Sequence, residues 1–437
     1  MLQSLRADTH YVSLDGGNVP PYTNGWASAA TNIQDAINDA LTVASDTMLV
    51  SNGMYQTGGT VAGSMTSRVY ISKAITVRSF NNDPTNTIIK GAWASSGQTN
   101  GTDAIRCVYM VNNSSLIGFT LTNGATIAGG DGGGALAQST SAGISNCVIT
   151  ICSAAGNGGG VRYATIYTSQ ITRNSSFGTG GGISDANVYD SQITSNSTPG
   201  GGGGSIYCTL YRSTISYNRA TGAAASAQGG GAQFCNLYNC IVAYNSSVGS
   251  GGGAYGSSGG GMGKTYYNCL FYGNETTGGN GGALYIYQIA ATLYNCTIAG
   301  NKSAYYGGGL RIDGIAANVI NCIIYLNTSS YDSSSDNYYA GAGGTLYFTN
   351  TCTFPAKGGW NASNTTNHPL FIANGTGSGN TLAAGNYHLR PDSPCVNSGL
   401  NAAAPAPDLD GKTRIRYGTV DMGAYELLYR GTIFGLR

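Results

Sequence analysis

The chain has 437 residues, of which 69 are glycine and 31 are tyrosine; 9% are charged, and the formal net charge is +1. So small a charge excludes attraction to nucleic acid or to an anionic membrane by bulk electrostatics. No stretch approaches 18 consecutive apolar residues, so no membrane-spanning helix is expected.

Residues 1–46 are predicted to form an extended segment and a capping helix. Residues 1–10 lack the apolar core of a secretory signal, so export would need a signal already removed or another route. The helix is expected from Thr31 to Ala44, with Thr31 or Asn32 as its cap and Asp35 in its first turn. Its expected apolar face consists of Ile33, Ile37, Ala40 and Leu41. Such a helix would cover the open end of the repeats that follow.

Residues 47–353 are predicted to be the repeat domain. From about Asn123 to Asn327 one short sequence motif recurs at intervals of 22 to 29 residues. Its Cys/Ser position is occupied by Cys147, Ser169, Ser191, Ser213, Cys240, Cys269, Cys296 and Cys322. An apolar residue follows two positions later, and five positions later comes an asparagine: Asn174, Asn196, Asn218, Asn245, Asn274, Asn301 and Asn327. A glycine run follows most copies. Self-similarity at such a period predicts a solenoid, a propeller or an array.

The local pattern favours one of these architectures. Apolar residues alternate within each copy, and Ile, Val, Thr and Tyr are frequent, which is typical of strands. The shortest copies are too short for a four-stranded propeller blade, but they accommodate three short strands. The sequence therefore predicts an all-β fold, a parallel β-helix in which each repeat forms one coil.

Equivalent positions of successive coils would stack about 4.8 Å apart as ladders. The asparagines are expected to adopt the left-handed turn conformation and to bond one another through their amides. The glycines are expected to supply positive φ at another corner. Most of the cysteines are predicted to be buried free thiols, although pairs such as Cys147–Cys152 and Cys235–Cys240 are close enough in sequence to form disulfides.

A tyrosine ladder stands two positions before the Cys/Ser and is the candidate binding site: Tyr167, Tyr189, Tyr211, Tyr238, Tyr267 and Tyr294. An aliphatic ladder stands three positions before the Cys/Ser, and an apolar ladder stands two positions after the Cys/Ser. These two positions are an odd number of residues apart, so they cannot lie on the same face of one uninterrupted strand. A bend or bulge must lie between them. If the tyrosines face outward, their stripe could stack on sugar rings or on another fibre. If they face inward, they are core.

Residues 354–437 are predicted to be a closing module and a tail. This module holds the densest charged group of the chain: Asp408, Asp410, Lys412, Arg414, Arg416, Asp421 and Glu426. The DLDG stretch is superficially similar to a calcium loop, but the remainder of that motif is absent. We interpret the group as a structural turn with ion pairs.

Several motifs resemble a known family. HPLF, YHLRPDSPCVNSG, DLDG and GTVDMGAYE resemble the closing module of bacterial secreted β-helix proteins of the choice-of-anchor type. The stretch YVSLDGGNVPPYTNGWASAATNIQDAI resembles the N-terminal cap of the same family, and the glycine-rich repeats are similar to those of chlamydial polymorphic outer-membrane proteins. The resemblance implies a right-handed parallel β-helix that is exported to the cell surface or beyond.

The sequence predicts no catalytic residue, no metal site and no cofactor. Hydrolysis of polysaccharides requires two carboxylates facing each other, and the repeats show no such ladder. Arg311 and Asp313 look isolated, and His10, His368 and His388 all lie outside the repeats.

The leading hypothesis is an exported, non-enzymatic structural or adhesive surface protein located outside the cell. A sharper form is self-assembly into fibres through the tail Leu427 to Arg437. The alternative is a β-helix protein that binds or degrades polysaccharide, as a lyase or a glycoside hydrolase. The expected partners are other copies of the chain or a surface polysaccharide, with no nucleic acid and no membrane span.

Overall fold

The computed structural model describes residues 7–261, 263–356, 360–404, 407–416 and 418–427. The chain divides into two compact units, Met1–Cys235 and Asn236–Arg437. The prediction of a right-handed parallel β-helix is confirmed, because the neighbours within each long sheet are strands of successive coils. In the part of the chain that the structure describes, no helix is long and apolar enough to cross a membrane.

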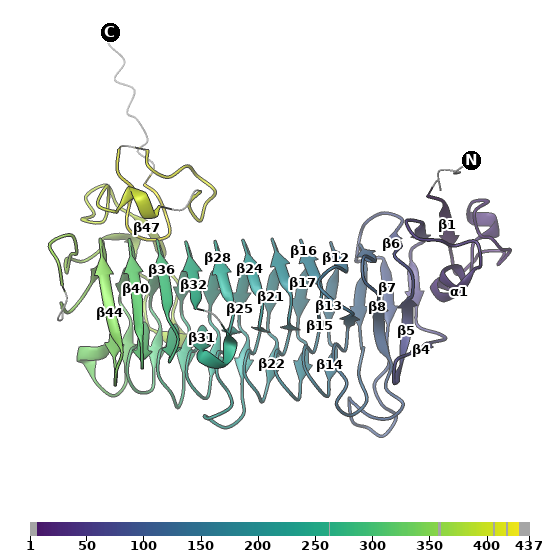
Figure 1. Ribbon diagram of the computed structural model, residues 1–437, viewed down its shortest axis with the longest axis horizontal. Coiled ribbons are helices and arrows are strands. Elements are labelled where there is room, and N and C mark those ends of the chain that lie inside the picture. Colours follow the sequence, from purple (N-terminus) through teal and green to yellow (C-terminus); the bar gives the residue numbers. More distant parts are fainter. Residues whose placement is uncertain (1–6, 262, 357–359, 405–406, 417, 428–437) are drawn as a thin grey trace, which may run out of the picture. The chain divides into compact units, whose positions relative to one another are not determined.

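Each regular coil of unit 1 contains four short strands, one more than the sequence predicts. One coil consists of β16 (Thr165–Tyr167), β17 (Gln170–Thr172), β18 (Ser175–Ser176) and β19 (Ile183–Ser184). The next coil repeats them as β20 (Asn187–Tyr189), β21 (Gln192–Thr194), β22 (Ser197–Thr198) and β23 (Ser205–Ile206). Equivalent strands pair in parallel and in register, as β17 and β21 do in Figure 1. The additional strand, β18 or β22, has only two residues and follows the asparagine, where no alternating pattern indicates it.

A left-handed residue lies between the tyrosine and the Cys/Ser of each copy, which supplies the predicted bend. Thr168 has φ +45° and separates β16 from β17. Ile166 and Ile171 are consequently both fully buried, whereas the Tyr167 side chain between them is 44% exposed. The tyrosine ladder therefore faces outward.

The asparagine ladder forms the expected chain of amide hydrogen bonds inside each unit. The Asn196 backbone and side-chain amides both donate to Asn218 Oδ1 at 3.0 Å, and the side chain also donates to Ile171 O at 2.9 Å. The predicted left-handed conformation is wrong for the asparagines. It falls one residue earlier, for example at Ser195 with φ +58°, because the asparagine must direct both of its amides along the stack.

The glycine and cysteine predictions are confirmed. Gly158 and Gly180 both have φ +65°, and a Cβ on Gly159 would lie 2.1 Å from Ser175 O. All eleven cysteines are buried free thiols, so neither suggested pair is a disulfide. Burial raises the pKa of the Cys147 thiol to about 11.

The N-terminal helix α1 (Ile33–Asn38) lies in unit 1 between β1 (Thr9–Val12) and β2 (Thr47–Val50) in the chain. Of the two predicted cap residues, Thr31 and Asn32, the cap is Asn32, since its Oδ1 accepts from Asp35 N at 2.8 Å. The helix ends at Asn38, well before the predicted Ala44, and Leu41 is 65% exposed rather than part of an apolar face.

Unit 2 continues the same construction. Strands β32 (Lys264–Tyr267), β36 (Ala291–Tyr294), β40 (Ala316–Ile320) and β44 (Thr345–Thr349) lie side by side in one sheet (Figure 1). A second sheet contains β31 (Ala254–Ser257), β35 (Leu284–Tyr287), β39 (Leu310–Asp313) and β43 (Tyr338–Ala340). After β45 (Cys352–Thr353) the chain forms the antiparallel pair β46 (Phe371–Ala373) and β47 (Asn386–Leu389).

Candidate functional site

The tyrosine ladder forms a stacked outer stripe within each unit. In unit 1 the rings of Tyr167 and Tyr189 have centroids 5.0 Å apart and lie within 14° of parallel, and Tyr189 and Tyr211 stack at 4.8 Å and 3°. In unit 2 the rings tilt, with Tyr238 and Tyr267 at 6.3 Å and 37°, and Tyr267 and Tyr294 at 4.8 Å and 50°. The near-parallel stack of unit 1 presents the edges of its rings more than their faces. Ligand binding by the ladder stays a prediction.

A second aromatic surface in unit 2 gathers residues that the sequence analysis did not bring together. The parallel register of β31, β35, β39 and β43 aligns Tyr255, Tyr285, Arg311 and Tyr339 in one column across four coils. Tyr306, which precedes the glycine run before β39, also packs here. We call Tyr285, Tyr306, Arg311, Asp313 and Tyr339 the Arg311 cluster.

The guanidinium of Arg311 lies among three tyrosine rings. Its Cζ is 5.5 Å from the ring centroid of Tyr285, 5.4 Å from that of Tyr306 and 5.3 Å from that of Tyr339, all within the range of cation–π attraction. Arg311 Nε donates to Asp313 Oδ2 at 2.7 Å, and Nη1 donates to Asn280 Oδ1. Nη2 has no hydrogen-bond acceptor among the residues that the structure describes. The expectation that Arg311 and Asp313 are isolated is therefore wrong.

Asp313 links the guanidinium to a tyrosine hydroxyl. Tyr285 Oη donates to Asp313 Oδ2 at 2.6 Å, and burial together with this carboxylate raises the pKa of Tyr285 far above its usual range. The hydroxyl therefore stays protonated as a donor. Asp313 is 6% exposed, and a Cβ on Gly341 would lie 1.7 Å from its Oδ1, so only glycine fits beside this carboxylate.

Exposed aromatic rings extend the cluster at its rim. Tyr331 is 64% exposed and contacts Tyr306, with ring centroids 4.9 Å apart. Tyr305 is 47% exposed and Tyr287 is 37% exposed, and their rings lie 6.2 Å from Tyr331 and 6.0 Å from Tyr285. Apolar ring faces beside a cation and a carboxylate form a surface that can both stack on a ligand and hydrogen-bond to it.

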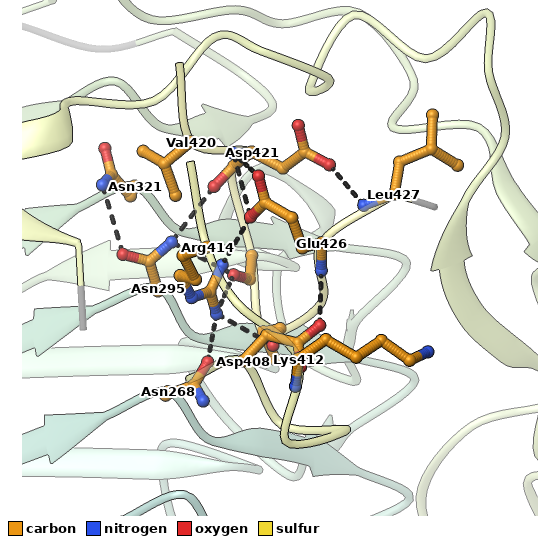
Figure 2. A network of polar contacts seen from close by, with 12 residues as sticks. Asn268, Asn295, Asn321, Asp408, Lys412, Arg414, Val420, Asp421, Glu426 and Leu427 are labelled. Atoms are coloured by element: carbon orange, nitrogen blue, oxygen red, sulfur yellow. Dashed lines mark hydrogen bonds and ion pairs between the residues drawn. The ribbon is translucent and has the colours of Figure 1, made fainter. Parts of the chain in front are cut away.

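Four members of the predicted charged group, Asp408, Arg414, Asp421 and Glu426, belong to a buried network against the solenoid of unit 2 (Figure 2), whereas the Asp410–Lys412 ion pair is partly exposed and Arg416 is exposed. Arg414 Nη1 lies 3.3 Å from Glu426 Oε2, and Nη2 donates to Ala424 O at 2.9 Å and to Asn268 Oδ1. The carboxylate of Asp421 accepts backbone hydrogen bonds from Asn397 and Leu427. The network is buried and its members bond one another, which supports the interpretation of a structural turn. Residues 428–437, which hold nearly all of the tail proposed for self-assembly, lie outside the described residues.

This network predicts a pH-dependent contribution to stability. Burial, with a further contribution from the charge of Asp421, raises the pKa of Glu426 from 4.5 to about 7, while Arg414 opposes the shift. The folded state therefore prefers the protonated carboxyl, so the contribution is complete below pH 4.5 and is lost as the pH rises through about 7. We expect the free energy of unfolding of wild type, minus that of Glu426→Gln, to fall between pH 4.5 and 7 and to level off at higher pH. A difference independent of pH would contradict the assignment.

No family model and no curated protein matches the chain. Among solved structures it is similar to a pectate lyase, at 13% identity and a TM-score of 0.46, with 97% of each chain covered. It is also similar to the A-module of a mannuronan C-5 epimerase from Azotobacter vinelandii, at 16% identity and a TM-score of 0.36, covering 70% of this chain and 80% of that one. A rhamnogalacturonan lyase follows at 13% identity and a TM-score of 0.33, covering 84% and 91%. Identities and TM-scores this low say nothing about the chemistry of this chain. The resemblance to choice-of-anchor and chlamydial proteins stays a prediction.

Proposed function

We propose that this chain is an exported polysaccharide-binding protein that holds its ligand on the outer face of unit 2, at the Arg311 cluster. The observation that carries the proposal is the arginine surrounded by three tyrosine rings and fixed by Asp313 and Asn280. Sugars present apolar ring faces and a rim of hydroxyls. The cluster offers a complementary set of aromatic rings, guanidinium donors and phenol hydroxyls.

Binding, rather than hydrolysis, is the activity that these residues support. The cluster contains a single carboxylate, Asp313, and its Oδ2 is already engaged by Arg311 and Tyr285. Glycoside hydrolysis needs a second carboxylate about 5–9.5 Å away. An adhesive role at a surface coated with polysaccharide is compatible with this proposal, because adhesion then follows from the same contacts.

The test is a binding comparison between wild type and two variants of the cluster. We expect wild type to bind at least one member of a panel of neutral and acidic polysaccharides, measured by affinity electrophoresis and isothermal titration calorimetry. Arg311→Met and Tyr306→Ala should each weaken that binding by about tenfold or more, because a stacked ring or a charged hydrogen bond at a site is worth about 1.5–3 kcal/mol.

Matched controls separate the cluster from a general effect of charge or aromatic content. Arg416→Met removes an exposed arginine of the same unit, and Tyr167→Ala removes an exposed ring of the tyrosine ladder. Loss of binding in Tyr167→Ala, with Arg311→Met unchanged, would move the site to the ladder. Absence of binding by wild type across the panel would refute the proposal.

A further inference from the structure

Unit 1 contains a small polar cavity far from the Arg311 cluster in sequence. It has a volume of about 220 Å³ and lies where α1 faces β3 (Gly53–Tyr55), β4 (Thr60–Ala62) and β5 (Met65–Ile71). Among its lining side chains are Asn32, Gln34, Asp35, Tyr55, Thr60 and Arg68. Sites for drug-sized ligands occupy about 300–1,000 Å³, so this cavity suits a smaller molecule or a single sugar residue.

Arg68 on β5 is a buried cation without a carboxylate partner. Its residue is 8% exposed, its Nε donates to Lys90 O at 2.8 Å, and its Nη1 donates to Gly58 O. Within the described ranges, no carboxylate forms an ion pair with its guanidinium. Burial lowers the pKa of Arg68. Buried charges are normally paired, because an uncompensated one is costly.

The other buried arginines show what is missing at Arg68. Arg414 is paired with Glu426. Arg106 lacks an ion pair too, but each nitrogen of its guanidinium donates to an acceptor: Gly132 O, Ser67 Oγ and Asp131 O. Nη2 of Arg68 has no acceptor among the described residues, and Arg68 lines the cavity. The cavity therefore presents an unused charged donor.

The opposite charge on the cavity wall restricts the ligand further. Asp35 lines the same cavity, where Asn32 Nδ2 donates to its Oδ2, and it does not reach Arg68. A multiply charged anion such as phosphate would be repelled by Asp35. A ligand that satisfies both groups carries one carboxylate for Arg68 and a hydroxyl that donates to Asp35.

We propose that this cavity binds a small hydroxycarboxylate, with Arg68 as the recognition residue for the carboxylate and Asp35 as the acceptor for a hydroxyl. The ligand has two sources that share this chemistry, a free hydroxy acid or an acidic sugar residue. The residues of this site all belong to unit 1. The proposal therefore does not depend on polysaccharide binding at the Arg311 cluster.

The experiment titrates the full chain with lactate, acetate, D-glucuronate and methyl β-D-glucoside, followed by thermal shift and calorimetry. We expect lactate or glucuronate to raise the melting temperature, and the neutral glucoside to have no effect. Tighter binding of glucuronate than of lactate would assign the site to acidic sugars, and the reverse order to free hydroxy acids. Absence of binding by both, or equal binding by the glucoside, would overturn the proposal.

Variants of the cavity residues test whether the ligand binds at Arg68. Arg68→Gln should weaken binding by about tenfold or more, since it removes a charged hydrogen bond. Because this substitution also removes hydrogen bonds to Lys90 and Gly58, a second variant is needed. Thr57→Phe closes the exposed mouth of the cavity and leaves Arg68 in place.

The acceptor role of Asp35 has its own test: Asp35→Asn should reduce the preference for lactate over acetate. Arg78→Gln, which removes an exposed arginine of unit 1, should bind as wild type does. Unchanged affinity in both Arg68→Gln and Thr57→Phe would refute the site.

Discussion

Replacement of Asn196 by alanine is expected to lower the free energy of unfolding by about 3–5 kcal/mol. The side chain is fully buried in the middle of the asparagine ladder of unit 1. It accepts from both amides of Asn174 at 2.9 and 3.0 Å, and it donates to Asn218 and to Ile171 O. Alanine leaves these buried groups without partners, and each unsatisfied group costs about 1–3 kcal/mol.

Urea unfolding followed by far-ultraviolet circular dichroism measures this effect. Asn187→Ala is the matched control, because Asn187 belongs to the same coil but is only half-buried. We expect the control to stay within about 0.5 kcal/mol of wild type. Equal midpoints for Asn196→Ala and Asn187→Ala would show that the ladder contributes nothing beyond its backbone bonds.

Replacement of Arg414 by methionine is expected to destabilise the closing module of unit 2 by about 3–5 kcal/mol, the usual cost of breaking a buried ion pair from one side. Above pH 7, where Glu426 is ionised, methionine leaves this carboxylate buried without its counter-charge. The substitution also removes the hydrogen bond to Asn268, which joins the module to the solenoid, and the one to Ala424 within the module. Figure 2 shows the contacts of Asn268 and Glu426 converging on the Arg414 guanidinium.

Limited proteolysis and urea unfolding measure the result. The variant should be cleaved within the closing module at protease concentrations that leave wild type intact, whereas the exposed-site control Arg416→Met should resist. The double variant Arg414→Met with Glu426→Gln should recover part of the loss, because it no longer buries an unpaired carboxylate. Wild-type resistance in Arg414→Met would mean that apolar packing alone holds the module.

The two proposed sites use arginine differently. Arg311 is held by Asp313 and Asn280 and is enclosed by rings, so its free edge can contact a long ligand that stacks along the surface. Arg68 lies in a small cavity, and its free nitrogen is suited to a single acidic group. Substitution at one site should leave binding at the other unchanged, so the two proposals fail independently.

The sequence by itself determined the architecture of this protein. Closely and almost evenly spaced copies with alternating apolar positions leave few folds other than a parallel β-helix, and the odd separation of two aliphatic ladders requires a bend. The buried thiols, the amide ladder, a helix cap at Thr31 or Asn32 and the ion pairs of the closing module follow from the same local patterns. The sequence could not determine that the helix ends at Asn38. It also could not determine which residue of each repeat takes the left-handed conformation, because both features depend on how each side chain contacts the next coil.

Only the tertiary structure decided the candidate sites. Tyr285, Arg311 and Tyr339 come from successive repeats of unequal length, and the insertions obscure their alignment until the strands are paired. The Arg68 cavity is lined by residues of helix α1 and of the β4–β5 hairpin. Both elements lie outside the regular repeats, so no periodicity in the sequence indicates that they are neighbours. A repeat predicts that equivalent positions stack, but insertions hide which residues are equivalent in the Arg311 cluster, and the Arg68 cavity uses residues outside the regular repeats. Only the folded structure brings these side chains together.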